Sequence, residues 1–446
     1  MELTDRVERE RLAKEAVYAE MKEHPIDLDG LYNALVNTIH YDYVGFEHKR
    51  KYYMPNESRT YVFSNYRYGT LTMEILARSL HQLVGDLHDR HLKFHCEDWI
   101  DYRNLGMPYR VRGAKDCLYV TSARPGAGVV PGDKILEVQS MPPERIRAYM
   151  RNVAFNSDIP ERELWGGYLR MARSLTVEHA DGRRERVETP PCPPFEENYP
   201  VEFRMLEDNT AYLKLERMDR EAIDALLAQH SGDIAGSKKL ILDLRRNVGG
   251  DWDACDGLLP YLVDRERSLT ELFGDEGCWC LFTENNCNRR YDVLSAFRAT
   301  LSDPEEIAMI DRELALYKDN VGKGLVYLPP EPVEGTVTPA SAAPEQVVVL
   351  TDTFCEDEGE AFAAQCKRCG SKVTVMGRPT MGTLDYFDPI TVAVHEKMTL
   401  SYPIRMTHAA HEGRGISEKG LPVDEYIPWT PAEIGRDLIL ERAMAL

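Results

Sequence analysis

The sequence predicts an α+β protein whose largest part is an α/β core, and three observations support this fold class. Apolar residues recur at helical spacing in the first hundred residues, and short strand-like runs separated by turn residues fill about 105–185. From about residue 200 onward, strand-like apolar runs alternate with helical patterns, which is typical of a sheet covered by helices. At 446 residues the chain is long enough for several domains.

The charge balance limits the classes of partner. The chain has 54 Lys and Arg residues against 74 Asp and Glu, a net charge of −20. Such an acidic surface repels phosphate backbones and anionic lipid, so we expect neither nucleic acid nor a membrane as partner. No apolar run approaches the roughly 20 residues that span a bilayer. The N-terminal sequence lacks the apolar stretch of a secretory signal, and we therefore expect a cytoplasmic location.

Ten cysteines at irregular spacing do not resemble a disulfide framework. Cys366 and Cys369 form one CxxC pair, and Cys278, Cys280 and Cys287 form a looser group. A zinc site needs four ligands, and a single CxxC without a matching second pair favours reduced thiols. The sequence therefore predicts neither a metal nor another cofactor.

A helix is expected over 73–84, where apolar residues recur at helical spacing, with Gly85 near its end. A charged stretch follows, in which His88, His91 and His95 lie among two aspartates. Spacings of three and four would place these histidines on one face if the segment were helical, as a metal site requires. Gly85 argues against that helix, and we favour a charged turn that carries one site histidine.

The segment 105–185 contains the run Arg124–Val138, RPGAGVVPGDKILEV, which resembles the core of a PDZ domain. The resemblance implies a groove that binds a peptide as an added strand and holds its terminal carboxylate. The alternative is a small β-rich domain without a ligand of its own. A proline-rich connector over 187–200 separates this domain, 105–185, from a core domain over 200–446, and a helical domain over 1–100 precedes both.

In the core, strands are expected over 211–216, 239–244 and 347–352, with a helix after the first of them. A long insertion covers about 265–345 and contains a helix that starts near Ser302, since Ser302 and Glu305 have capping-box spacing. A further strand near 391–404 should complete the core.

The run Leu242–Gly250, LDLRRNVGG, places two glycines directly after a hydrophobic strand. Glycines allow a tight turn that presents backbone N–H groups, and two such groups can form an oxyanion hole for acyl transfer. Alone, a diglycine after a strand more often marks an ordinary turn.

Taken together, these motifs resemble the C-terminal processing, or tail-specific, serine peptidases. The resemblance rests on LDLRRNVGG, on the strand and loop VVVLTDTFCEDEGEAFAAQC, on GRPTMG at 377–382 and on the closing run GISEKGLPVD at 415–424. It implies a ββα-spiral core of the crotonase and ClpP type, a PDZ-like domain and a helical N-terminal segment. It also implies that the partners are peptides or the C-termini of unfolded proteins.

Carrying over the family's functional positions leaves one gap. The nucleophilic serine stands three residues before an acidic residue, here Glu360, so its place is taken by Asp357. The place of the lysine in the serine–lysine branch is Thr383, whereas the branch like the tricorn core implies His91 and Glu418 as acid–base residues. The same resemblance assigns the oxyanion donors to Gly249, Gly250 and Glu358, the residue after the nucleophile position.

Aspartate at the nucleophile position is unsuited to catalysis. A carboxylate is a poor nucleophile toward an amide, and its charge would repel the negative charge that develops in the oxyanion hole. Asp357 and Glu360 instead have the spacing of a helix cap with a capping box. We therefore expect a family member that binds peptides and has lost most or all hydrolysis.

Two alternatives remain open. Cys355 could supply a thiolate near a helix N-terminus and keep the chain an active peptidase, although its acidic neighbours oppose this. Asp357 could also act as a general base for a water. A non-enzymatic scaffold that binds peptides through the PDZ-like groove overlaps with the first interpretation.

Overall fold

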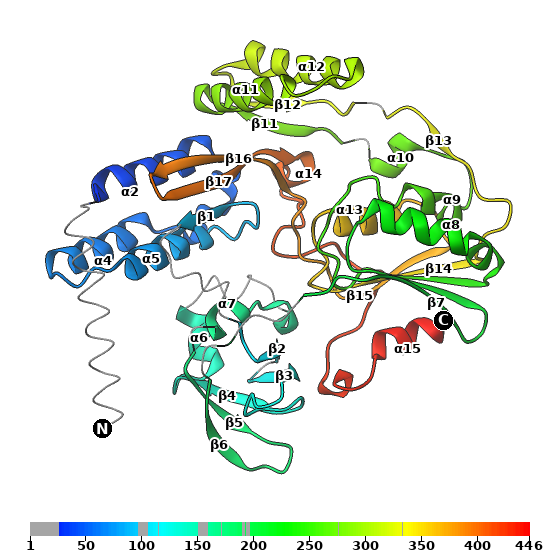
Figure 1. The fold of residues 1–446 in the computed structure, drawn as a ribbon, viewed down its shortest axis with the longest axis horizontal. Helices are drawn as coiled ribbons and strands as arrows, with labels where there is room; N and C mark the ends of the chain where they lie inside the picture. Colours follow the sequence, from blue (N-terminus) through cyan, green and yellow to red (C-terminus); the bar gives the residue numbers. More distant parts are fainter. Residues whose placement is uncertain are drawn as a thin grey trace. The chain divides into compact units, whose positions relative to one another are not determined.

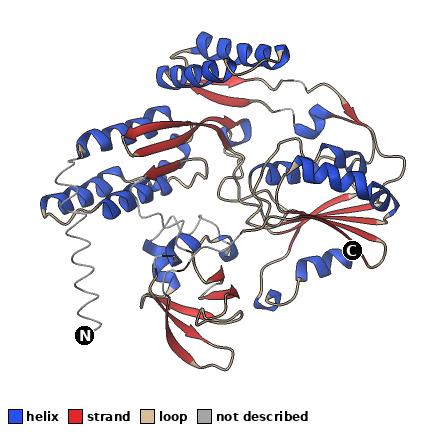
Figure 2. Ribbon diagram, in the orientation of Figure 1, coloured by secondary structure: helices blue, strands red, loops and turns tan. Residues whose placement is uncertain are grey.

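The computed structural model describes residues 26–96, 106–114, 116–149, 159–170, 172–189, 192, 197–274, 276–331 and 333–446. The expectations for the first 25 residues and for part of the proline-rich connector fall outside these residues. The described residues confirm a mixed α and β architecture with several sheets (Figure 2). They form two compact units, and each unit is built from segments far apart in the sequence.

The first unit joins the N-terminal helices to two later segments, 278–328 and 386–411. Its sheet has the strand order β1-β17-β11-β12, and β16 pairs with β17. The strands are β1 (Lys93–Cys96), β11 (Cys278–Phe282), β12 (Gly324–Leu328), β16 (Tyr386–His395) and β17 (Met398–Thr407). The α-helices are α2 (Leu28–Asn37), α3 (Phe46–Lys49), α4 (Pro55–Arg67), α5 (Met73–Gly85), α11 (Glu284–Arg298), α12 (Pro304–Asn320) and α14 (His408–His411).

Helix α5 shows how local sequence and packing agree in this unit. Thr72 caps the helix by accepting from the backbone amide of Ile75, and the apolar side chains face inward as the spacing predicted. Leu80 shares a buried core with Leu35 of α2 and Leu400 of β17. Figure 1 shows α11 and α12 beside the antiparallel pair of β11 and β12.

The second unit contains the largest sheet, with the order β18-β15-β14-β9-β8-β7. Its strands are β7 (Val201–Leu206), β8 (Thr210–Leu215), β9 (Lys239–Asp243), β14 (Gln346–Thr351), β15 (Val373–Gly377) and β18 (Glu425–Tyr426). All neighbours pair in parallel except β7 and β8. The short strands β10 (Arg267–Ser268) and β13 (Thr336–Val337) form a separate pair.

Helices cover both faces of this sheet, so its central strands are buried apolar runs. Leu242 and Val349 face a core shared with Ile223 and Phe362, whereas Val348 faces a core shared with the C-terminal helix. The helices are α8 (Arg220–Gly236), α9 (Leu259–Leu262), α10 (Leu269–Phe273), α13 (Asp357–Cys366) and α15 (Leu438–Met444). Figure 1 shows α8, α9 and α13 on one side of the sheet and α15 on the other.

The same unit carries a five-stranded antiparallel sheet in the order β2-β3-β4-β5-β6. Its strands are β2 (Tyr109–Gly113), β3 (Leu118–Ala123), β4 (Lys134–Val138), β5 (Ser174–Glu178) and β6 (Arg184–Glu188), and its helices are α6 (Pro143–Tyr149) and α7 (Gly166–Leu169). Trp165, Leu118 and Val177 meet in its core. The β-rich character predicted for 105–185 is confirmed for the described residues.

Two local predictions were wrong. Helix α12 is capped by Asp303, which accepts from the amides of Glu305 and Glu306, and not by Ser302. The single strand expected over 391–404 is a hairpin of β16 and β17, and it belongs to the sheet of the first unit. Among the described residues, no helix combines the length and the apolarity needed to cross a bilayer.

Candidate active site

Two turns in the second unit bring predicted site residues together. β9 and β14 are neighbouring parallel strands, so the segments that follow them emerge at the same edge of the sheet. The turn after β9 carries Gly249 and Gly250, and the turn after β14 leads into α13 at Asp357. The backbone amide of Glu356 donates to the carbonyl of Asn247 (3.0 Å), which fixes the two turns to each other.

Asp357 occupies a left-handed backbone conformation, with φ of 50°. Only a small fraction of non-glycine residues adopt it, and such positions cluster at functional sites. A Cβ built on Gly249 would lie 2.8 Å from Cβ of Asp357, so the diglycine bend can approach Asp357 closely because it lacks side chains.

The predicted capping box of Asp357 and Glu360 is wrong. Helix α13 begins at Asp357 itself, Glu356 stands in the N-cap position, and no side chain of that position caps the helix. Glu360 is fully buried and binds a distant loop. It accepts hydrogen bonds from the amides of Gly382 (2.7 Å) and Thr383 (2.6 Å) and from the hydroxyl of Thr380.

Thr383, in the family's lysine position, links this carboxylate to Asp357. Its hydroxyl donates to Oε2 of Glu360 (2.9 Å) and accepts from the backbone amide of Asp357 (2.9 Å). Burial raises the pKa of Glu360 and outweighs the hydrogen bonds that lower it. Glu360 therefore anchors the 379–384 loop, and Thr383 links this carboxylate to the backbone of Asp357.

The closing run packs on the same loop. The amide of Leu421 donates to Oγ1 of Thr380 (2.7 Å), and a Cβ on Gly382 would lie 3.3 Å from the amide nitrogen of Glu418. The amide of Ser417 donates to the buried carboxylate of Asp385 (2.6 Å). Glu418, with φ of 69°, thus has its backbone beside the 379–384 loop.

Arg162 holds this loop from the side of the five-stranded sheet. Its buried guanidinium donates to the carbonyls of Pro379 (3.0 Å), Thr380 and Met381 (3.0 Å). The sequence offered no signal for this role, because Arg162 lies more than two hundred residues from its partners and in no motif.

A second buried charge cluster supports the turn after β14. Arg112 donates to Oδ1 of Asp352 (3.0 Å), and Arg378 donates to Oδ2 (3.2 Å). Burial alone would raise the pKa of Asp352, but the two guanidinium groups hold it below its ordinary value. This cluster was also not predicted.

Both amides of the diglycine bend, which the family resemblance assigns as oxyanion donors, have hydrogen-bond acceptors in this structure. Gly249 and Gly250 both have positive φ, which glycine adopts without steric cost. The amide of Gly249 donates to Oδ1 of Asn247 (2.9 Å), and the amide of Gly250 donates to Oε2 of Glu358 (2.8 Å). Both N–H groups therefore already have acceptors within the chain.

The histidine of the predicted site lies in the first unit. His91 belongs to the turn between α5 and β1, where its backbone amide donates to Oδ1 of Asp89 (2.8 Å). The hydroxyl of Tyr43 donates to the other oxygen of Asp89 (2.7 Å). The stretch of charged residues that follows α5 is therefore a turn, and the side chain of Asp89 orders it. Among the described residues, the group whose side chains lie close enough together to hold a metal ion does not include His88, His91 or His95.

The alternative nucleophile is in an unfavourable setting. Cys355 is fully buried, and burial, followed by the nearby charges of Glu360 and Glu356, raises the pKa of its thiol well above the ordinary value. Cys366 and Cys369 of the CxxC pair are likewise buried thiols with raised pKa values, and no disulfide joins them.

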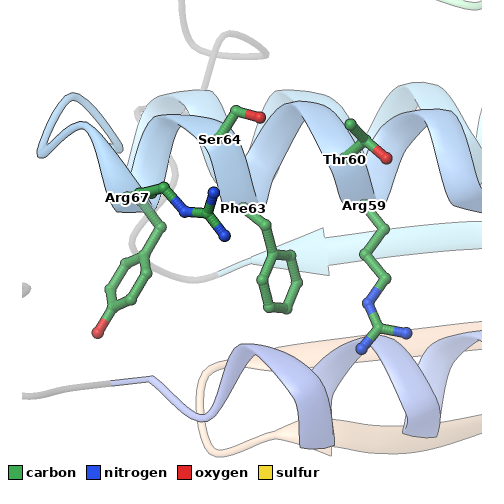
Figure 3. A pocket seen from close by; sticks show the side chains of 6 residues that line it. Arg59, Thr60, Phe63, Ser64 and Arg67 are labelled. Atoms are coloured by element: carbon green, nitrogen blue, oxygen red, sulfur yellow. The ribbon is translucent and has the colours of Figure 1, made fainter.

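A cavity lies on helix α4 of the first unit. Figure 3 shows Arg59 and Phe63 on one side of the helix and Thr60 and Ser64 on the other. The cavity has a volume of about 590 Å³, and its described lining contains no carboxylate, histidine or cysteine. Its hydroxyl groups, on Thr60, Ser64 and Tyr66, therefore have no carboxylate, histidine or cysteine beside them in this lining to act as a base.

Comparison with known proteins identifies the fold and the family. Residues 209–427 match the model of peptidase family S41. Mature CPAF is 14% identical with a TM-score of 0.65, covering 94% of this chain and 96% of that one. Mature CPAF complexed with lactacystin is also 14% identical, with a TM-score of 0.63, and the match covers 94% of this chain and 97% of that one. No curated protein sequence matches the chain. Through residues 209–427, which carry the diglycine bend, the turn of Asp357 and the closing run, this chain belongs to peptidase family S41.

Proposed function

We propose that this chain is a peptide-binding member of the tail-specific branch of the family in which hydrolysis is lost or weak. The proposal rests on one observation: the turn that enters α13 beside the diglycine bend carries Asp357 at φ of 50°. A nucleophile in such a strained strand-to-helix turn is exposed to its substrate. Here the side chain is a carboxylate, which attacks an amide poorly and opposes the charge of a tetrahedral intermediate.

The supporting residues keep roles consistent with an inherited site. Glu360, Thr383 and Thr380 still fix the loops around position 357. Under this proposal His91 and Glu418 are vestigial acid–base residues of a site like that of the tricorn core, and Asp357 occupies the serine's place. The Cys355 alternative is disfavoured by the burial and the raised pKa of its thiol.

The β2–β6 sheet with α6 supports a PDZ-like module as the part that recognises peptides. Its strands are antiparallel, and the glycine-rich run predicted from the sequence lies between β3 and β4. A peptide that adds to such a sheet is held by main-chain hydrogen bonds and by its terminal carboxylate. We propose peptide C-termini as ligands and a cytoplasmic location.

The test is direct. Purified protein should cleave neither an unfolded protein nor C-terminal peptides, and it should not react with a serine-directed phosphonate. Labelling that maps to the turn at 357, or turnover that disappears in Asp357→Ala, would overturn the proposal. Pull-down with peptides that have a free or an amidated C-terminus tests the PDZ-like module separately. Only the peptides with a free C-terminal carboxylate should be retained by the protein.

A further inference from the structure

The carboxylate of Glu358 lies over the diglycine bend. Glu358 is the second residue of α13, and its Oε2 accepts from the amide of Gly250 at 2.8 Å. A Cβ built on Gly249 would lie only 2.5 Å from the same oxygen. The carboxylate therefore fills the space that the missing side chain of Gly249 leaves open.

The neighbouring amides of the bend have fixed partners. Val248 donates to the carbonyl of Glu216 (3.0 Å), Gly249 to the buried side chain of Asn247 (2.9 Å), and Asp251 to the carbonyl of Met218 (2.7 Å). These acceptors belong to the backbone or to a fully buried amide. Of these four amides, Gly250 alone donates to a partly exposed side chain.

The acceptor of the Gly250 amide therefore differs from those of the other three amides, and this N–H is the position in the bend at which a ligand can bind. A backbone N–H beside a glycine bend binds the oxygen of an acyl group in a peptidase. In this chain the oxygen that it binds comes from Glu358. The carboxylate at position 357 lies beside the same bend, so a second anion would be repelled and a neutral carbonyl oxygen is the better external ligand.

We propose that Glu358 is a built-in occupant of the Gly250 amide, and that a peptide carbonyl reaches this donor only by displacing the Glu358 carboxylate. The inference rests on the proposed function, because it assumes that peptides approach this turn. It adds a second obstacle to hydrolysis, besides the missing hydroxyl at position 357. Even with a hydroxyl nucleophile at that position, the amide that would bind the oxyanion would be occupied.

The occupancy is tested in the full chain without any activity assay. Amide hydrogen exchange at Gly250 should become about five to ten times faster in Glu358→Ala, as expected for the loss of one charge-assisted hydrogen bond. Glu358→Gln, whose amide oxygen still accepts, should give an intermediate rate. Glu221→Ala is the matched control, since Glu221 is the second residue of α8 and stands as far from its own helix start.

The block is tested in the Asp357→Ser background. Labelling by a serine-directed phosphonate should be at least about tenfold faster in Asp357→Ser/Glu358→Ala than in Asp357→Ser, because one oxyanion donor typically contributes about a hundredfold or more in rate. Asp357→Ser/Glu221→Ala should match Asp357→Ser.

The outcomes separate this inference from the proposed function. Unchanged exchange at Gly250 in Glu358→Ala overturns the inference, and so does labelling that is measurable in both the single and the double variant but equally fast in the two. Both of these results leave the role of Asp357 standing. If exchange accelerates but neither variant labels, the occupied donor is supported, while the assignment of position 357 as the nucleophile's place is contradicted.

Discussion

The backbone amide of Asp357 donates a hydrogen bond to the hydroxyl of Thr383, with an N···Oγ1 distance of 2.9 Å. That hydroxyl in turn donates to the buried carboxylate of Glu360 (2.9 Å). A strained residue persists only where its surroundings hold it. This chain of hydrogen bonds connects the turn at Asp357 to an anchor in the core of the second unit.

Replacing Thr383 should therefore weaken the site and the fold together. Thr383→Val keeps the shape but leaves the Asp357 amide and one oxygen of Glu360 without this partner, so we expect the free energy of unfolding to fall by about 1–3 kcal/mol. Chemical denaturation measures the change, and amide exchange at Asp357 should accelerate. Thr336→Val, on the exposed strand β13, should change stability by less than about 0.5 kcal/mol. A Thr383→Val protein as stable as the parent would show that the hydroxyl does not anchor the turn.

The backbone conformation of Asp357 predicts an inverted order of glycine and alanine. At φ of 50° glycine is free of the Cβ penalty, so Asp357→Gly should be more stable than Asp357→Ala by about 1 kcal/mol. At Asp224, inside helix α8, the order should be reversed by a similar amount, since glycine is the poorer helix former. Thermal unfolding of the four variants measures both differences. The same order at both positions would contradict the left-handed conformation of Asp357.

The elements that the sequence predicted correctly are those whose signals are local. The apolar runs of β8, β9 and β14 are buried on both faces, and the helical spacing of α5 matches its buried side. The boundary of α12 was misplaced by one residue because Ser302 and Asp303 are both good caps, and the sequence does not decide between them. The β16–β17 hairpin was read as one strand because its turn, Glu396 and Lys397, contains no glycine, asparagine or proline.

The parts that could not be predicted depend on long-range contacts. Asp357 and Glu360 have the spacing of a capping box, but Glu360 instead meets Thr380 and Thr383, some twenty residues later. Gly250 and Glu358 meet across more than a hundred residues because β9 and β14 are neighbours. Motif spacing named the candidate residues of the site, whereas their hydrogen-bond partners depend on the register of the sheet.

Cys355 should be unreactive in the folded protein. Its thiol is fully buried and its pKa is raised well above the ordinary value, so little thiolate forms and reagents have no access. With iodoacetamide at pH 8, we expect Cys355 to be alkylated at least about tenfold more slowly than the half-buried Cys117, and at a similar rate after denaturation. Mass spectrometry of tryptic peptides gives both rates. If Cys355 is alkylated faster than Cys117 in the native state, the result would support the alternative hypothesis that Cys355 is the nucleophile.

Asp352 should make the second unit sensitive to acid. Its pKa is lowered in the folded state because Arg112 and Arg378 outweigh the effect of burial. A carboxyl with a lowered folded-state pKa contributes stability that is present above its unfolded value, about 3.9, and is lost as the pH falls through the folded value. The stability difference between the parent and Asp352→Asn should therefore be largest near neutral pH, at about 3–5 kcal/mol for a broken buried pair, and should shrink below about pH 4.

Urea unfolding between pH 7 and pH 2.5 measures this stability difference, with Asp224→Asn on the exposed face of α8 as control. A difference that stays constant down to pH 2.5 would mean that Arg112 and Arg378 do not stabilise the ionised carboxylate, and that the turn after β14 is held by its other contacts.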